Sequence, residues 1–350
     1  MGASDSIRVC LGYPALDTPD FHERLRCVDP RLEPISLPVD PGSDWFNASP
    51  GQPHEEPPPW AVRVAEERLR SLAHAEVLIA LTTPKDLMSL APNLRWIQGI
   101  GAGVEQFAAA GVRRDQVAVT NASGVSAVSM AEFVIGRLLQ IWKRFREADA
   151  YQATHEFVRT YGRTFAGSTL GIVGMGSIGC EVALRARGFG LRVLGLKRST
   201  RPGDVSELAD ALYGPDQLHE MLSDCDAVVV AAPATSETHH LFDEDAFGAM
   251  REGAVLVNVA RGSLVEEAAL LEALTSGHLA AAALDVFEQE PLPAASPLWD
   301  VPNLYVSAHS SVSVDRYLED VFEIFSDNLR RYLAGEPLRN AVDMEALGFS

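Results

Sequence analysis

The segment Leu170–Gly179 constrains the fold of this chain more than any other. An apolar run, Leu170–Val173, leads directly into glycines at 174, 176 and 179, and a helical pattern follows. Gly174 allows a tight turn, Gly176 lets the backbone approach a pyrophosphate, and Gly179 allows a helix to pack closely on a strand. The spacing predicts a dinucleotide-binding strand–turn–helix unit, and a glycine-rich turn without a ligand is the alternative. The expected coenzyme contacts here are Gly174, Gly176, Ser177, Ile178 and Gly179.

Strand-like runs and helix-like segments such as Glu181–Arg187 alternate through this part of the chain. Such alternation predicts a parallel, doubly wound α/β sheet with right-handed crossovers. The expected strands are Leu170–Val173, Arg192–Leu196, Ala227–Ala231, Ala254–Val259, Ala281–Val286 and Leu304–Ser307.

The earlier part of the chain predicts a second α/β unit, with a helix at Trp60–Leu72. Residues 30–59 are rich in proline and exclude a regular helix or a central strand, so an irregular surface segment is expected. A helix over 126–151 would link the units, and one over 314–333 would pack back on the first. The expected strands of this unit are Ile7–Leu11, Val77–Leu81, Leu94–Ile100 and Val117–Val119.

The composition narrows the classes of partner. The 350 residues carry 29 Lys+Arg and 48 Asp+Glu, a formal net charge of -19, which repels nucleic acid and anionic membranes alike. We therefore expect neither as a partner. The four cysteines, Cys10, Cys27, Cys180 and Cys225, form no CxxC pair and are expected to be small buried hydrophobes in a reducing compartment. Without a signal-peptide or transmembrane pattern, a cytoplasmic protein is expected.

The end of the second expected strand indicates which coenzyme is preferred. An NAD-preferring site usually places a carboxylate about 20 residues after the glycines, to bind the ribose 2′-hydroxyl. Here the sequence reads Leu196-Lys197-Arg198-Ser199, with Arg201 close by. Because these cations would attract a 2′-phosphate, NADP(H) is the expected coenzyme, with NAD(H) as the alternative.

Three functional side chains follow strands at the ligand-binding edge of the sheet. Arg261 comes after the strand ending at 259, Glu290 after the one ending at 286, and His309 after the one ending at 307. Such a trio suits hydride transfer at a carbon beside a carboxylate. Arg261 would hold the carboxylate, His309 would exchange the hydroxyl proton, and Glu290 would orient the imidazole. No metal-binding pattern is present, so no metal is expected.

The ordered motifs resemble the D-isomer-specific 2-hydroxyacid dehydrogenase family over nearly the whole chain. They comprise residues 99–105, Thr120-Asn121, Ala131-Glu132, the glycine motif, Pro233 with Thr238, residues 258–262, residues 285–292 and His309. The resemblance implies a Rossmann dinucleotide-binding domain over 125–311, inserted in a flavodoxin-like substrate domain of 1–124 and 312–350. It also implies that the substrate lies between these domains and that the protein is a homodimer.

The same resemblance implies roles for individual residues. Arg261, Glu290 and His309 would be the catalytic trio, and the amides of Ala102 and Gly103 would bind the substrate carboxylate. Asp285 would lie near the nicotinamide carboxamide. The expected coenzyme contacts outside the glycine motif are Lys197, Arg198, Pro233, Thr238, Val259, Ala260 and Asp285.

The predicted reaction interconverts a small 2-keto acid, such as glyoxylate or hydroxypyruvate, and its D-2-hydroxy acid. Ala308 and Ser310 beside His309, and Phe157 where the family has tryptophan, depart from the family pattern and bear on substrate preference and the dimer contact. Two alternatives remain open: a catalytically silent dinucleotide sensor that binds proteins, resembling the corepressor branch of this fold, and a dehydrogenase of another small anion such as phosphite.

Overall fold

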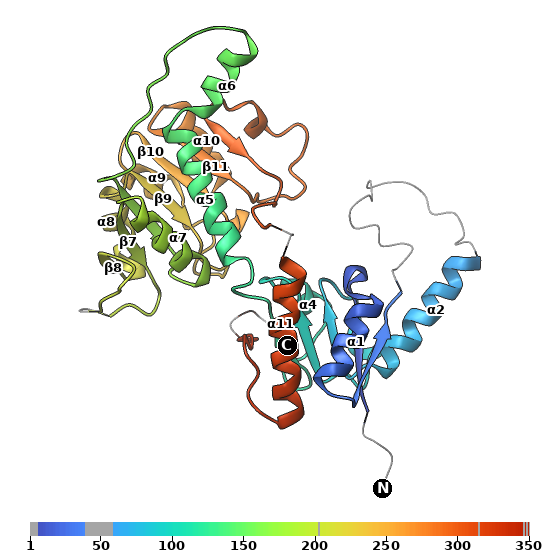
Figure 1. Cartoon of the computed structure of the whole chain (residues 1–350). Helices are drawn as coiled ribbons and strands as arrows, with labels where there is room; N and C mark the ends of the chain where they lie inside the picture. The colour runs from blue at the N-terminus through green and yellow to red at the C-terminus, as the bar shows by residue number, and fades with distance from the viewer. Residues whose placement is uncertain are drawn as a thin grey trace. The chain divides into compact units, whose positions relative to one another are not determined.

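Two parallel β-sheets form the frame of the chain (Figure 1). The computed structural model describes residues 6–38, 59–201, 204–313, 316–345, 347 and 349, and the side chains of 59–65 lie outside this description. One sheet belongs to unit 1, formed by Met1–Val125 with Asp315–Ser350, and the other to unit 2, Ser126–Val314. Among the described residues, no helix is long and apolar enough to cross a membrane.

The sheet of unit 1 has the order β2-β1-β3-β4-β5, with all neighbours parallel. This order is flavodoxin-like, as the family resemblance implied for this domain. The strands are β1 (Ile7–Leu11), β2 (Leu32–Ser36), β3 (Val77–Ala80), β4 (Trp96–Gly99) and β5 (Ala118–Thr120). The helices are η1 (Pro14–Leu16), α1 (Pro19–Val28), α2 (Pro59–His74), α3 (Leu87–Leu90), α4 (Glu105–Ala109) and α11 (Tyr317–Ala334).

The last helix, α11, completes the core of unit 1. Its Phe322 ring lies edge-on to Phe21 of α1 at 4.9 Å, and Phe325 lies 5.4 Å from the buried ring of Trp96. These aromatic contacts confirm that the final helix packs on the first unit, and they explain why residues on both sides of unit 2 in the sequence form one core.

The sheet of unit 2 has the order β12-β11-β10-β9-β6-β7-β8, again parallel throughout. The order reverses beside β6, the strand that precedes the glycines, and a doubly wound sheet binds ligands at such a reversal. The strands are β6 (Thr169–Val173), β7 (Arg192–Leu196), β8 (Ala211–Tyr213), β9 (Ala227–Val230), β10 (Ala254–Asn258), β11 (Leu279–Leu284) and β12 (Leu304–Val306). The helices are α5 (Ala127–Trp142), α6 (Phe145–Ala153), α7 (Ser177–Gly188), η2 (Pro215–Gln217), α8 (Leu218–Ser223), α9 (Glu244–Ala249), η3 (Gly262–Leu264), α10 (Glu267–Thr275) and η4 (Pro297–Asp300). The predicted two-domain α/β fold is therefore confirmed.

The single helix expected over 126–151 is wrong. Arg144 adopts a left-handed backbone conformation with φ of 58°, which ends α5 and starts α6 in a new direction. Its guanidinium pairs with Glu147 on the new helix. α6 buries none of its residues and extends away from the body of unit 2 (Figure 1), and the Phe157 side chain beyond it is 98% exposed.

Two further expectations need correction. Leu32–Ser36, inside the segment expected to be irregular, forms the edge strand β2. Pro34 is tolerated there because one side of an edge strand has no neighbouring strand to receive an N–H donor, which proline lacks. Residues 39–58 lie outside the described residues.

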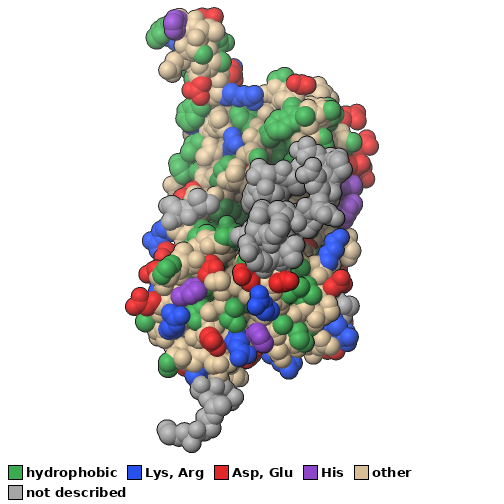
Figure 2. Space-filling model, turned by 90° about the vertical axis from the view of Figure 1, so that its right-hand side faces the viewer, with side chains coloured by type: hydrophobic (Ala, Val, Ile, Leu, Met, Phe, Trp, Pro, Cys, Tyr) green, Lys and Arg blue, Asp and Glu red, His purple; other side chains and the backbone are tan. Residues whose placement is uncertain are grey.

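The expectation that all four cysteines are buried is also wrong: Cys27 is exposed and Cys180 half-buried, whereas Cys10 and Cys225 are buried. On the face of unit 1 seen in Figure 2, acidic and basic side chains are interspersed.

Candidate active site

The glycine turn after β6 combines two positions that only glycine fits with one that is open. Gly174 has φ of 105°, and a Cβ there would lie 2.6 Å from the amide nitrogen of Ala232. A Cβ on Gly179 would lie 2.0 Å from the Gly174 carbonyl oxygen, so α7 packs against the turn only with glycine at this position. At Gly176, the residue before α7, a Cβ would meet no atom within 4 Å beyond the adjoining residues. Open space beside the N-terminus of a 12-residue helix fits a dinucleotide phosphate.

The basic turn after β7 lies beside the glycine turn. The amide of Gly174 donates to the Leu196 carbonyl at 3.0 Å, which joins the two turns at the ends of neighbouring strands. The side chains of Lys197 and Arg198 are exposed, and neither forms an ion pair with any described residue. These two cations can therefore bind an external anion without first breaking an internal pair.

The loop after β9 is a closed turn. Thr238 Oγ1 donates to the Pro233 carbonyl at 2.7 Å and accepts from the amide of Thr235 at 2.8 Å. A surface pocket of about 570 Å³ opens beside the turn, lined by Ala234, Thr235, Ser236 and His239. Pro233 and Thr238, which the family resemblance implied as coenzyme contacts, thus shape this loop.

A buried amide shapes the turn that carries Arg261. Asn258 at the end of β10 is fully buried; its Oδ1 accepts from the amide of Ala260 at 2.9 Å, and its Nδ2 donates to the Arg261 carbonyl at 3.0 Å. The Arg261 guanidinium donates to the Ala260 carbonyl at 2.8 Å. A Cβ on Gly262 would lie 2.0 Å from the Phe287 carbonyl oxygen, so only glycine fits. Sequence reasoning missed the role of Asn258. The pattern that could have indicated it is a single polar residue at the end of an otherwise apolar strand.

Asp285, directly after β11, holds the loop that carries His309. Its buried carboxylate accepts from Ser307 Oγ at 2.7 Å and from the amides of Ser310 and Ser311, both at 3.0 Å. The His309 amide donates to the Asp285 carbonyl at 2.8 Å, and His309 itself has φ of 48°, unusual for a residue other than glycine. Among the described residues, the hydrogen bonds that this carboxylate accepts therefore come from the loop that carries His309.

The structure brings Glu290 and His309 together. His309 Nδ1 lies 2.8 Å from Glu290 Oε2, and Glu290 Oε1 accepts from the Phe287 amide at 3.0 Å. The imidazole side chain is 50% exposed and the carboxylate side chain 36%, so both remain accessible. A carboxylate on Nδ1 leaves Nε2 to exchange a proton with a ligand.

In unit 1, the loop 101–103 has its carbonyls engaged and its amides available. The Gly101 carbonyl accepts from the amide of Ala122 at 2.9 Å, and the Ala102 carbonyl accepts from Asn121 Nδ2 at 2.8 Å. The Gly103 carbonyl accepts from Gln106 Nε2 at 3.4 Å. Within the part of the chain that the structure describes, the amides of Gly101, Ala102 and Gly103 donate to no acceptor. A run of free amides is suited to binding an anion.

The expected site residues fall on both units. Ala102 and Gly103 belong to unit 1, while the trio, the glycine turn, the basic turn and the β9 loop belong to unit 2. Val259 and Ala260 are buried within the Arg261 turn. Over the described ranges, no group of three or more His, Cys, Asp and Glu side chains is placed to hold a metal ion.

Comparison with known proteins identifies the class of protein. Residues 135–311 match the model for the NAD-binding domain of D-isomer specific 2-hydroxyacid dehydrogenases. The chain is 33% identical over 302 residues to a glyoxylate reductase of Korarchaeum cryptofilum, an alignment covering 84% of this chain and 89% of that protein. It therefore belongs to the D-isomer specific 2-hydroxyacid dehydrogenase family, and it is an NAD(P)-dependent 2-hydroxyacid dehydrogenase.

Solved structures place the whole fold in the same family. A family protein from Aeromonas salmonicida superposes with a TM-score of 0.79 at 33% identity, covering 97% of this chain and 99% of that one. An NADPH-dependent glyoxylate/hydroxypyruvate reductase from Sinorhizobium meliloti, in complex with NADP and sulfate, superposes with a TM-score of 0.78 at 27% identity, covering 98% and 100%.

Proposed function

We propose that this enzyme reduces a small 2-keto acid such as glyoxylate or hydroxypyruvate to its D-2-hydroxy acid, with NADP(H) preferred over NAD(H). The observation that carries the proposal is the 2.8 Å contact between His309 Nδ1 and Glu290, on the loops that follow β11 and β12. A proton donor and a glycine turn that fits a dinucleotide, both at the carboxyl ends of strands in one parallel sheet, suit reduction of a carbonyl.

Each residue of the trio has a separate part in the proposed reaction. The bound nicotinamide supplies the hydride that reduces the carbonyl carbon. Arg261 holds the substrate carboxylate and polarises the neighbouring carbonyl oxygen. His309 Nε2 gives that oxygen its proton, so the carbonyl gains one hydride and one proton. Glu290 Oε2 accepts a hydrogen bond from His309 Nδ1 and so orients the imidazole for this transfer. The amides of Ala102 and Gly103 are proposed as further carboxylate ligands.

The coenzyme preference rests on the basic turn. Lys197 and Arg198 are exposed, lack internal ion pairs among the described residues, and follow β7, where an NAD-preferring site usually has a carboxylate. The reductase from Sinorhizobium meliloti, which is named NADPH-dependent, supports the same preference. On an otherwise acidic chain, these cations provide local attraction for a 2′-phosphate.

The first experiment follows oxidation of NADPH and, separately, NADH with glyoxylate, hydroxypyruvate, pyruvate and phenylglyoxylate. We expect turnover with the smaller acids and a preference for NADPH. Replacing both Lys197 and Arg198 by Ala should raise the KM for NADPH about 10-fold or more and leave that for NADH within about two-fold. His309→Ala should lower kcat at least about 100-fold without weakening coenzyme binding.

Absence of turnover with every acid, despite dinucleotide binding, would contradict the proposed function. Equal use of NADH and NADPH would contradict only the coenzyme preference.

We further propose that the enzyme is a homodimer in which α6 and Phe157 are covered by a second copy. A nine-residue helix with no buried residue gains little stability from its own chain. Light scattering coupled to gel filtration should report twice the 37.8 kDa chain mass, and Phe157→Asp should shift it toward the monomer. A monomeric wild-type protein would contradict this assembly.

A further inference from the structure

The amides of Ala102 and Gly103 are oriented by the carbonyls that precede them. In a trans peptide, the carbonyl of one residue and the N–H of the next point in opposite directions. The Gly101 carbonyl accepts from the amide of Ala122 at 2.9 Å, and the Ala102 carbonyl accepts from Asn121 Nδ2 at 2.8 Å. These two bonds therefore fix the directions of the two amides that are proposed to bind the substrate carboxylate.

Both donors come from the turn after β5, and the C-terminal tail holds that turn. Asn340 Nδ2 donates to the carbonyls of Asn121 at 3.2 Å and Ser123 at 2.8 Å, while the amide of Asn121 donates to the Asn340 carbonyl at 3.2 Å. The bond to the Asn121 carbonyl fixes the peptide whose N–H, on Ala122, binds the Gly101 carbonyl. Asn340 is thus linked to the amide of Ala102 through two peptide groups, the one between residues 121 and 122 and the one between residues 101 and 102.

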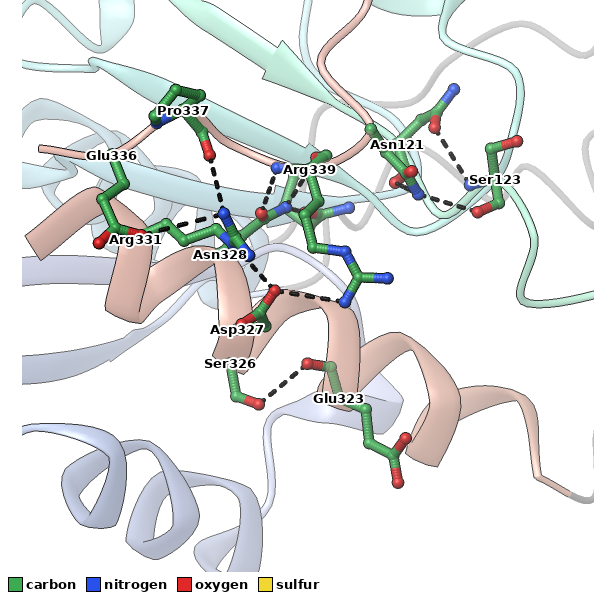
Figure 3. A network of polar contacts seen from close by, with 12 residues as sticks. Asn121, Ser123, Glu323, Ser326, Asp327, Asn328, Arg331, Glu336, Pro337 and Arg339 are labelled. Atoms are coloured by element: carbon green, nitrogen blue, oxygen red, sulfur yellow. Dashed lines mark hydrogen bonds and ion pairs between the residues drawn. The ribbon is translucent and has the colours of Figure 1, made fainter. Parts of the chain in front are cut away.

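The tail is itself anchored to unit 1. Asn328 of α11 is fully buried; its Oδ1 accepts from the Arg339 amide at 2.7 Å, and its Nδ2 donates to the Arg339 carbonyl at 3.0 Å (Figure 3). The same Nδ2 also donates to Gln98 Oε1 at 3.2 Å. Beyond Asn340, the tail pairs antiparallel with the edge of the sheet, where the amide of Val342 donates to the Val119 carbonyl at 2.9 Å. Asn340 is therefore presented from a fixed backbone, with φ of 54°.

We propose that Asn340 is a positioning residue for substrate: through the 121–123 turn, it holds the 101–103 loop so that its amides face the substrate carboxylate. This inference rests on the proposed function, in which those amides bind a 2-keto acid. It assigns to the C-terminal tail a part in substrate affinity, separate from coenzyme binding and from proton transfer.

The test compares Asn340→Gly with wild type. Glycine accepts the left-handed backbone at 340, so this change removes the two side-chain bonds while the backbone bond to Asn121 can persist. We expect the KM for glyoxylate, and the Kd for oxamate bound to the enzyme with NADPH, to rise about 5- to 20-fold. The kcat and the Kd for NADPH should stay within about two-fold, and Asn121→Ala should give the same split.

Asn93→Ala is the matched control, because Asn93 Nδ2 also donates to a main-chain carbonyl of unit 1, that of Ala73, at 2.8 Å. It should leave all four constants unchanged. An unchanged oxamate Kd in Asn340→Gly would overturn the inference, and so would an equal loss in kcat and coenzyme affinity.

A readout without substrate separates this inference from the proposed function. Amide resonances of Ala102 and Gly103 in ¹⁵N spectra should shift in Asn340→Gly and not in Asn93→Ala. If wild type neither binds oxamate nor reduces any keto acid, the proposed function fails, whereas unchanged Ala102 and Gly103 resonances in Asn340→Gly overturn the coupling itself.

Discussion

At the residue scale, buried polar side chains shape the loops that carry the proposed chemistry. Asn258 and Asp285 follow apolar stretches of neighbouring strands: Asn258 binds main-chain groups of the turn directly after it, and Asp285 binds main-chain amides of the loop after β12. Burial by itself would raise the pKa of Asp285, but hydrogen bonds from Ser311, Ser307 and Ser310 outweigh it and hold the pKa below its ordinary value. The ionised carboxylate therefore stabilises the left-handed conformation of His309.

Replacing Asp285 by Asn should lower the free energy of unfolding by about 2–3 kcal/mol at pH 7. The side-chain NH₂ of asparagine would face O–H and N–H groups that now donate hydrogen bonds to the carboxylate. The folded pKa lies below the unfolded one of about 3.9, so the stabilisation is complete above that pH and is lost as pH falls through the folded pKa. Thermal unfolding from pH 7 to pH 3 checks this. A difference between wild type and variant that is as large at pH 3 as at pH 7 would show that the charge contributes nothing.

At the element scale, the glycines at the β6–α7 junction differ in whether the fold requires them. Gly179 is required by packing, because a side chain there would collide with the Gly174 carbonyl, whereas the space beside Gly176 is open. The backbone of Gly176, with φ of −88° and ψ of −159°, is accessible to any residue. The fold therefore does not require glycine at 176, which is consistent with the proposed role of this position in binding a phosphate.

The two positions should respond differently to alanine. Gly176→Ala should change the Tm by no more than about 2–3 °C but raise the Kd for NADPH about 10-fold or more. Gly179→Ala should lower both stability and affinity, since the turn must move to admit the methyl group. Calorimetry and coenzyme fluorescence measure the two effects, and full NADPH affinity in Gly176→Ala would count against phosphate binding at this turn.

At the scale of the whole molecule, each unit has its own hydrophobic core. The two clusters around the seven-stranded sheet contain only residues of unit 2, and the two around the five-stranded sheet contain only residues of unit 1. Unit 2 is also continuous in the sequence, whereas unit 1 is formed from both ends of the chain. Unit 2 thus has what an independent domain requires.

We therefore expect residues 126–313, expressed alone, to fold and to bind NADPH within about three-fold of the full-length affinity, but to reduce no keto acid. Circular dichroism and coenzyme fluorescence test folding and binding. A fragment that remains unfolded would show that unit 2 depends on unit 1 for its stability.

Local sequence patterns predicted every strand except β2 and β8, the helices α2, α7 and α11, and the glycine turn, because side-chain periodicity and the steric needs of Gly174 and Gly179 act over a few residues. The same patterns indicated Arg261, Glu290 and His309 as separate loop residues. They did not predict the break at Arg144, which depends on one left-handed residue within an apolar pattern suited to a single helix.

Only the tertiary structure decided which distant groups meet. The contact of His309 with Glu290 spans 19 residues, and that of Asn340 with Asn121 spans 219. Such contacts depend on the order of strands in a sheet and on where the chain returns to it, and no local propensity encodes either. For that reason the sequence by itself determined the chemistry available to this protein, while the fold decided how its loops hold that chemistry in place.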